Sequence, residues 1–399
     1  MNFVELSKKF EEEIIDERRY LHSNAEVGFE LPKTVEFVER KLTEMGYRVK
    51  RCGKNGIVTT IGNGAGKTFL LRADMDALPL KEESDVEFAC KNGCFHGCGH
   101  DMHTAMLLGA ARVLKAVEAE LNGTVKLMFQ PAEEILSGAK NMIENGLMDS
   151  PKPDGAIMLH VMAGLPMKTG SVIVSAGGIS APAADYFTVN IKGRGCHGSM
   201  PQDGVDALSV ASHTVVALQE ISARELGVSE AALLTIGLLR AGTAGNVIAD
   251  TAVFEGTLRS FSDEVRLRLK KRLEEISVGI ASTFRAKAEV VFGNGCPSLV
   301  NDEKLSASVK KYIEDLLGEK SVFSSDDFGE DSSKKGGSED FSYISREVPS
   351  VMLAIAAGNS EEGYAYAQHH PKVIFDESVL TVGSAVYAYS AFRWLQDNK

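Results

Sequence analysis

The stretch TFLLRADMD, residues 68–76, is an apolar run that ends in two aspartates. Apolar runs of the same kind occupy residues 124–130 and 155–160. Helical patterns lie before or between these runs, at residues 31–45 and 104–117. Strands that alternate with helices predict an α/β fold, in which a mixed central sheet is flanked by helices on both faces.

Acidic residues and a histidine stand at the ends of these apolar runs. They are Asp74 and Asp76 in the first, Glu133 and Glu134 after the second, and His160 at the end of the third. Ligands of open α/β sheets usually gather outside the carboxyl ends of the strands. We therefore expect a functional site along this edge of the sheet.

A second pattern begins after about residue 184. Residues 187–191 alternate between apolar and polar side chains, which is typical of a half-exposed strand. A helix, two strands, a helix and a strand follow, at residues 205–226, 232–239, 247–261, 262–284 and 288–292. This βαββαβ order can fold as an independent, ferredoxin-like domain. We expect it to be inserted, as residues 185–293, into a catalytic domain formed by residues 1–184 and 294–399.

The segment after the insert supports this division, because helices and strands like those before residue 184 resume there. The expected elements are a helix at residues 303–317, a strand at 350–355 and a terminal helix from Glu377. The acidic, Ser/Gly-rich stretch at residues 324–337 is expected to be a mobile loop. The first 22 residues have the pattern of a charged amphipathic helix.

Composition and charge limit the possible functions. A length of 399 residues favours two domains. The formal net charge of −12 argues against a nucleic-acid partner, and no apolar run approaches the roughly 20 residues that span a bilayer. The N-terminus has no apolar signal core. We expect a cytoplasmic protein whose six cysteines are reduced thiols or metal ligands.

The densest group of potential metal ligands is the segment 90–103, which contains three cysteines and three histidines. A structural zinc site usually needs two paired Cys/His clusters in one small unit, and no second CxxC pair follows. We therefore expect Cys98 and His100 to be ligands of a site that is completed from elsewhere. Cys90 and Cys94 are expected to be packing thiols.

The adjacent Glu133 and Glu134 follow the strand-breaking Pro131, and we expect their carboxylates to point in different directions. One carboxylate can then bind a metal while its neighbour holds a proton, as metal-assisted hydrolysis requires. His160, and a histidine pair before Pro371, are ambiguous alone. The joint occurrence of these signals predicts a hydrolytic metal site.

Two other catalytic motifs are not supported. The segment 62–68 resembles a phosphate-binding loop, but Ile61 stands where the first glycine of GxxxxGK[ST] should be, and a strand follows instead of a helix. We expect a hairpin turn there. The chain also lacks the GxSxG elbow of serine hydrolases.

Six motifs carry a family resemblance. In chain order they are residues 71–79 (LRADMDALP), 98–101 (CGHD), 130–134 (QPAEE), 195–198 (GCHG), 246–248 (NVI) and 337–341 (GSEDF). The sequence resembles the aminoacylase/carboxypeptidase family of dinuclear metallohydrolases. It is most similar to the amidohydrolase branch that includes hippurate hydrolase and the plant auxin-conjugate hydrolases. The resemblance runs from about residue 19 to residue 370, nearly the whole chain.

The resemblance implies a complete metal site. Its ligands would be Cys98, His100, Glu134, His160 and His369, and the general base would be Glu133. The family's spacing of histidine, one residue and then proline selects His369 over its neighbour. Other members have a bridging carboxylate where this branch has the CGHD segment. Because a thiolate softens the site, two ions of zinc, manganese, cobalt or nickel are all admissible.

The resemblance also gives the inserted domain a role, as a lid that forms a homodimer. His197 would then donate to the oxyanion in the partner's site, with Asn246 beside it. Arg259 matches the position expected to bind a substrate carboxylate, and a strand-surface ion pair is the alternative. Cys196 is a departure, because the family commonly has glycine before the histidine.

These residues predict hydrolysis of the amide bond of N-acyl amino acids, of the hippurate or N-acetyl type. An exopeptidase or dipeptidase acting on short peptides, and an N-acetyl-diaminopimelate deacetylase, are the nearest alternatives. A non-catalytic metal- or ligand-binding protein is an alternative of another class. A redox role for Cys90, Cys94 and Cys196 is a third.

Overall fold

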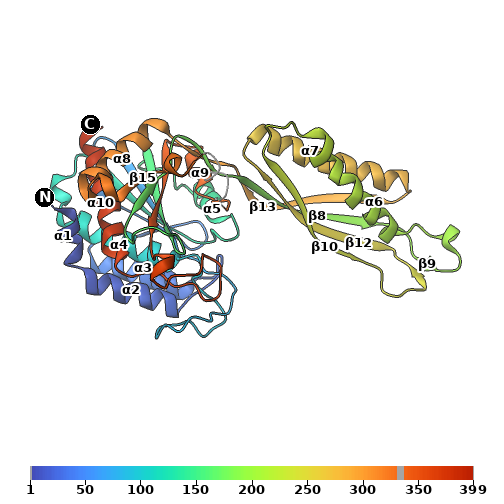
Figure 1. The fold of residues 1–399 in the computed structure, drawn as a ribbon, viewed down its shortest axis with the longest axis horizontal. Coiled ribbons are helices and arrows are strands. Elements are labelled where there is room, and N and C mark those ends of the chain that lie inside the picture. The colour runs from blue at the N-terminus through green and yellow to red at the C-terminus, as the bar shows by residue number, and fades with distance from the viewer. Residues whose placement is uncertain (1, 330–336, 399) are drawn as a thin grey trace. The chain divides into compact units, whose positions relative to one another are not determined.

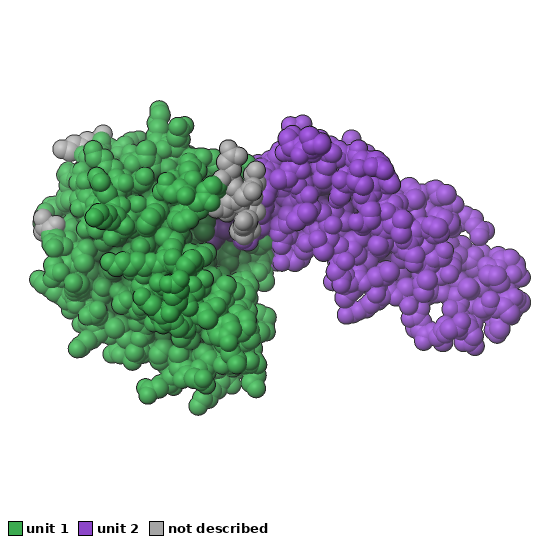
Figure 2. Space-filling view, in the orientation of Figure 1, with its two compact units in different colours: residues 1–180, 300–336, 340–399 green, residues 181–299, 337–339 purple. Residues whose placement is uncertain are grey.

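The computed structural model describes residues 2–329 and 337–398. The chain divides into two compact units, which Figure 2 colours separately. Unit 1 comprises Met1–Ser180, Val300–Gly336 and Asp340–Lys399, and unit 2 comprises Ala181–Leu299 and Gly337–Glu339. The loop expected at residues 324–337 lies largely outside the described residues, and within them Ser325–Phe328 is a 3-10 helix.

Unit 1 contains an eight-stranded sheet in the order β1-β2-β4-β3-β5-β16-β6-β15 (Figure 1). Its strands are β1 (Lys50–Cys52), β2 (Gly56–Gly62), β3 (Thr68–Asp74), β4 (Thr124–Gln130), β5 (Gly155–Met162), β6 (Val172–Val174), β15 (Val322–Ser324) and β16 (Ser350–Ala356). The central strands β4, β3, β5 and β16 are parallel, whereas β2 and β6 run antiparallel to β4 and β16. The expected mixed sheet is confirmed, and the carboxyl ends of its parallel strands share one edge.

Helices flank this sheet. They are α1 (Phe3–Lys8), α2 (Glu11–Ser23), α3 (Pro32–Glu44), α4 (His100–Ala116), α5 (Gly138–Glu144), α8 (Glu303–Leu317), α9 (Ser342–Ser345) and α10 (Val379–Asp397). Helices α4 and α10 pack on each other and on β3, whereas α5 contacts β4 and α9 contacts β16 (Figure 1). Strands β3 and β4 are buried along their whole length, as apolar strands covered on both faces should be. Over residues 2–329 and 337–398, no helix has the length and apolarity to cross a membrane.

Three predictions about unit 1 are wrong in detail. Helix α4 begins at His100 rather than residue 104, because its first turn carries polar side chains that an apolar pattern does not register. The N-terminal helix is interrupted at Lys9 and Phe10 and forms α1 and α2. The segment 62–68 is not a hairpin, because β2 and β3 both pair with β4, which lies between them.

Unit 2 contains an antiparallel four-stranded sheet in the order β10-β12-β8-β13 and two helices that pack on it. Its elements are β8 (Ala183–Lys192), β9 (Cys196–His197), α6 (Ala207–Glu220), β10 (Ala232–Ala241), β11 (Val247–Ile248), β12 (Thr251–Ser260), α7 (Asp263–Thr283) and β13 (Lys287–Cys296). Short strands β7 (Gly178–Ala181) and β14 (Leu299–Asn301) mark where the chain passes between the units. The strand expected at residues 247–261 is divided, because β11 pairs with β9 and β12 with the main sheet.

Candidate metal centre

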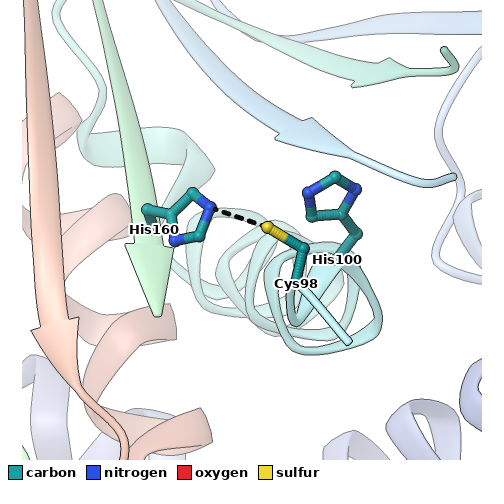
Figure 3. A group of neighbouring side chains, drawn as sticks. All are labelled: Cys98, His100 and His160. Atoms are coloured by element: carbon teal, nitrogen blue, oxygen red, sulfur yellow. Dashed lines mark hydrogen bonds between the residues drawn. The ribbon is translucent and has the colours of Figure 1, made fainter. Parts of the chain in front are cut away.

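The turn at Gly99 brings Cys98 and His100 together. Gly99 has φ +87°, and a Cβ atom there would lie 2.2 Å from Val161 Cγ2, so glycine is required. His100 is the first residue of α4. Cys98 Sγ lies 3.5 Å from Nε2 of His160, which is near the carboxyl end of β5 (Figure 3). Two segments that are 62 positions apart in the sequence therefore converge.

Two groups of potential metal ligands share the Cys98 thiol. The ligand atoms of Cys98, His100 and His160 lie within 4.8 Å of one another. The ligand atoms of Cys98, Glu134 and His369 also lie within 4.8 Å of one another. Each group offers three ligand atoms of the kinds that bind divalent cations in hydrolytic sites, and Cys98 belongs to both groups.

Hydrogen bonds fix the tautomers of two histidines. His100 Nδ1 lies 2.8 Å from the Asp76 carbonyl oxygen, and His160 Nδ1 lies 2.7 Å from that of Val161. A carbonyl oxygen only accepts, so both Nδ1 atoms carry the hydrogen. The Nε2 atoms are then available as ligands, in the arrangement common to metal-binding histidines.

Asp76 anchors the acidic turn that follows β4. Its carboxylate accepts hydrogen bonds from the backbone N–H groups of Glu133 and Glu134, at 2.9 and 3.2 Å. Ala132 has φ +57°, a conformation that is uncommon for residues with a Cβ atom. Both carboxylates lie near His100 Nε2, at 3.9 Å for Glu133 and 3.8 Å for Glu134. Each carboxylate therefore has one oxygen beside the same histidine, whereas only Glu134 also groups with Cys98 and His369.

His369 is held near the cluster by its backbone. Its N–H donates to the Gly97 carbonyl oxygen at 2.9 Å, and the Gln368 side chain donates to that of Val161 at 2.7 Å. The φ angle of His369 is +65°, and its Nε2 lies 3.6 Å from Glu134 Oε1. Because strained backbone of this kind is common at functional sites, the geometry favours this residue over the following histidine, which stacks on a tyrosine ring.

The charges in the cluster are unbalanced. Burial, with Asp76 nearby, raises the pKa of Glu134 to about 7. Burial also raises the pKa of the Cys98 thiol. Burial opposes a charge on His100, but Asp74 and the Cys98 thiol outweigh it and raise the pKa of that histidine. Glu134, Cys98 and His100 therefore tend to keep their protons. A bound cation would replace these protons and reduce the repulsion between the carboxylates.

The donor set fits a divalent cation. His100 Nε2 and Glu134 Oε1 are buried and have no hydrogen-bond partner in the described part of the chain. Burial lowers the pKa of His160 to about 3, so that ring is neutral at pH 7. Buried polar atoms without partners are unfavourable, and a cation between these nitrogen, oxygen and sulfur atoms would be coordinated by them.

Three of the expected functional residues lie in unit 2. His197 is exposed in β9, with Nδ1 2.7 Å from Ser199 Oγ. Asn246 directly precedes β11, the strand that pairs with β9. Arg259 lies in β12 with its guanidinium 5.9 Å from the Tyr186 ring centre, and it forms no ion pair with a described residue. His197 and Asn246 thus share one two-stranded ribbon.

A buried ionic network behind His100 was not predicted from the sequence. Asp101 Oδ2 lies 2.8 Å from both Arg18 Nε and His22 Nδ1, and His22 Nε2 lies 3.1 Å from Glu82. Burial opposes a charge on His22, but the hydrogen bonds to Asp101 and Glu82 raise its pKa. The presence of Asp101 in the CGHD motif was the only sequence signal for this network, because the residues that contact Asp101 lie far from it in the sequence.

Cys90 and Cys94 belong to none of the potential metal-binding groups of the described residues. Cys90 is buried in a small apolar cluster with Ala25 and Ala77, against which Cys94 packs. All six cysteines are free thiols. The geometry is that of packing residues, as expected.

The sequence profile described as "Peptidase family M20/M25/M40" matches residues 70–393. The chain belongs to this family. The resemblance found in its motifs is thereby confirmed, and the protein is a hydrolase of the M20 type.

Similar proteins extend over the whole chain. It is 35% identical over 401 residues to an N-acetyl-L-cysteine deacetylase of Bacillus subtilis. This alignment covers 100% of this chain and 92% of the relative. It is 35% identical to the IAA-amino acid hydrolase ILR1-like 2 of Arabidopsis thaliana, with coverage of 95% and 84%. A crystal structure of the Bacillus subtilis YXEP protein, a dinuclear metal-binding M20 peptidase, matches with a TM-score of 0.78, 30% identity and coverage of 98% and 99%.

Proposed function

We propose that this M20 hydrolase cleaves the amide bond of N-acyl amino acids with two divalent cations, ions of zinc, manganese, cobalt or nickel. The observation that carries the proposal is the pair of ligand groups that share Cys98, with the Glu133 carboxylate beside them. Cys98, Glu134 and His369 would hold one of these ions. The names of two relatives, a deacetylase and an amino acid hydrolase, support this substrate class.

His100 and His160 would hold the second ion with Cys98, because the ligand atoms of these three residues lie within 4.8 Å of one another. Cations held there lower the pKa of water and polarise a carbonyl group. Glu133 removes one proton from the attacking water, whose oxygen bonds to the carbonyl carbon. When the C–N bond breaks, Glu133 returns that proton to the amine nitrogen. The products are a carboxylic acid and a free α-amino acid.

Glu133 is suited to this role by its position. Its side chain is 9% exposed, and the Asp76 hydrogen bond to its amide fixes the backbone. A carboxylate in a buried site keeps its proton for the leaving group instead of exchanging it with bulk water. Arg259 would bind the carboxylate of the amino acid, since it has no other charged partner among the described residues.

A side-by-side assay of hippurate, N-acetyl amino acids, N-acetyl-diaminopimelate and dipeptides tests the substrate class. We expect the acyl amino acids to be hydrolysed fastest, their C-terminal amides far more slowly, and all activity to stop after metal removal. Arg259→Met should raise KM for the acids and leave the amides unchanged. Faster hydrolysis of dipeptides would favour an exopeptidase. Stoichiometric metal without turnover would favour the metal-binding alternative.

We also propose that unit 2 forms a homodimer that places His197 and Asn246 in the partner's site. Supporting this, apolar side chains are exposed on edge strand β10 and on α6, including Leu233, Leu239 and Val216 at 65%, 46% and 71%. Exposed apolar edges of sheets are typical sites of association. His197 would donate a hydrogen bond to the oxyanion as it forms.

Mixing two inactive variants tests this arrangement. In a His197→Ala and Glu133→Gln heterodimer, one site would combine an intact base with an intact partner histidine. Random pairing of equal amounts should therefore restore about a quarter of the wild-type activity. Each variant mixed with itself is the control. No recovery after verified subunit exchange would show that both residues act in one chain.

We also propose a cytoplasmic location. Cys98 would bind a cation through a free thiol, and all six cysteines of the chain are free thiols. Reducing compartments maintain such thiols. Recovery of the chain in the exported fraction of its host cells would contradict this location.

A further inference from the structure

Asp340 is fully buried in unit 1, yet no step of the proposed reaction uses it. Its Oδ1 accepts hydrogen bonds from Arg72 Nη2 at 3.1 Å and Gln130 Nε2 at 2.6 Å. Its Oδ2 accepts from the Ala139 amide at 2.9 Å. Arg72 Nε also donates to Gln130 Oε1 at 2.9 Å. These three side chains form a closed ring that fixes the guanidinium from two sides.

The ring continues toward the metal centre through Asp74. Arg72 Nη1 donates to Asp74 Oδ2 at 2.5 Å, and Asp74 Oδ1 lies 2.6 Å from His103 Nδ1. His103 Nε2 accepts from the Val161 amide at 2.8 Å, so the hydrogen of this ring is on Nδ1, facing Asp74. All the side chains in this chain of contacts are buried.

The last contact reaches a proposed metal ligand. Val161 follows His160, and its carbonyl oxygen accepts the hydrogen of His160 Nδ1 at 2.7 Å. The rings of His103 and His160 are also 4.5 Å apart in an edge-to-face arrangement. The position and tautomer of His160 are therefore set by a connected series of hydrogen bonds that begins at Asp340.

We infer that Asp340 is a positioning residue for the metal centre, acting on His160 through Arg72, Asp74 and His103. The inference rests on the proposed function and adds a residue that belongs to neither of the two ligand groups that share Cys98. The Arg72 guanidinium also engages the Asp74 oxygen that lies 3.7 Å from His100 Nε2. Because Arg72 holds this oxygen, the Asp74 carboxylate does not compete with the proposed ligands for the cation.

Asp340→Asn tests the inference, because it preserves size and removes the charge that pairs with Arg72. We expect cobalt affinity, measured by competition with a chelating dye, to fall by about 10- to 100-fold, as for other residues that support metal ligands. The absorption spectrum of the bound cobalt should shift. With saturating metal, kcat should fall while KM changes little. Gln130→Met leaves the charges paired and should give a smaller change in the same direction.

Glu17→Gln is the matched control. Glu17 is equally buried in unit 1 and pairs with Arg112, but it does not touch the Asp340 series. It should lower the free energy of unfolding without changing cobalt affinity. The effect of Asp340→Asn should also shrink in an Asp74→Asn background, where the series is already broken.

Two results separate this inference from the proposed function. If the wild-type protein binds metal and hydrolyses substrate, but Asp340→Asn and Gln130→Met match its affinity and spectrum, the positioning role is wrong. A wild-type protein that binds no cation would overturn the proposed function and this inference together. Reduced stability with unchanged metal affinity would assign Asp340 a structural role only.

Discussion

Glu133→Gln is expected to lower kcat by roughly 10²- to 10⁴-fold, the usual contribution of a general acid–base residue, while both cations remain bound. Glutamine keeps the shape of the side chain and can still lie beside His100, but it cannot accept a proton from water. The Glu133 side chain is nearly buried, so bulk water cannot easily replace it. Steady-state kinetics and metal analysis on the same preparation measure both parts of the prediction.

The adjacent residue provides the control for this variant. Glu134→Gln removes a proposed ligand from the group formed with Cys98 and His369, so metal content should fall together with activity. The two substitutions have the same chemistry at neighbouring positions and differ only in the assigned role. If Glu133→Gln kept substantial turnover with both cations bound, another group would have to be the base.

Cys98→Ala is expected to have the largest effect on metal binding, because this thiol is the only member common to both ligand groups. Affinity should fall by well over the roughly 100-fold that loss of a supporting residue produces, and turnover should be lost with it. Cys98→Asp restores an anionic ligand, so it should recover part of the binding. Its metal preference should move toward manganese, because carboxylates favour harder cations than thiolates do.

The control for Cys98 lies in the same segment. Cys90→Ala removes a buried thiol that packs against Ala25 and Ala77, so metal content should not change. Unchanged metal content in Cys98→Ala would contradict the shared-ligand assignment. In the wild type, binding should strengthen as pH rises, because a cation must displace protons from Cys98 and from His100, whose pKa is raised.

Local sequence patterns predicted the elements of unit 1 that surround the site. Apolar runs located β3, β4 and β5 to within two residues of their observed ends, because strands covered on both faces are continuously apolar. The same patterns missed the first turn of α4, where the buried side chains of His100 and His103 are polar. Burial there is compensated by ionic and hydrogen-bonding partners that no periodicity reports.

Motifs predicted which residues would matter, but not how they are supported. Asp74 and Asp76 stood out as acidic residues at a strand end and within the motif at residues 71–79. In the structure, Asp76 holds the Glu133 amide and Asp74 bridges an arginine and a histidine. Asp76 and Glu133 are 57 positions apart, and Asp74 and His103 are 29 apart, so no spacing within one sequence can pair them.

By itself, the sequence determined the mixed α/β class, the edge of the sheet where the site lies, and the metallohydrolase family. These properties follow from local chemistry: apolar periodicity, strand ends and ordered motifs. Only the tertiary structure decided that Cys98 is common to both ligand groups and that Asp340 reaches His160 through three side chains. The reason is physical, because coordination and buried hydrogen bonds depend on ångström-scale positions that are set when distant segments pack together.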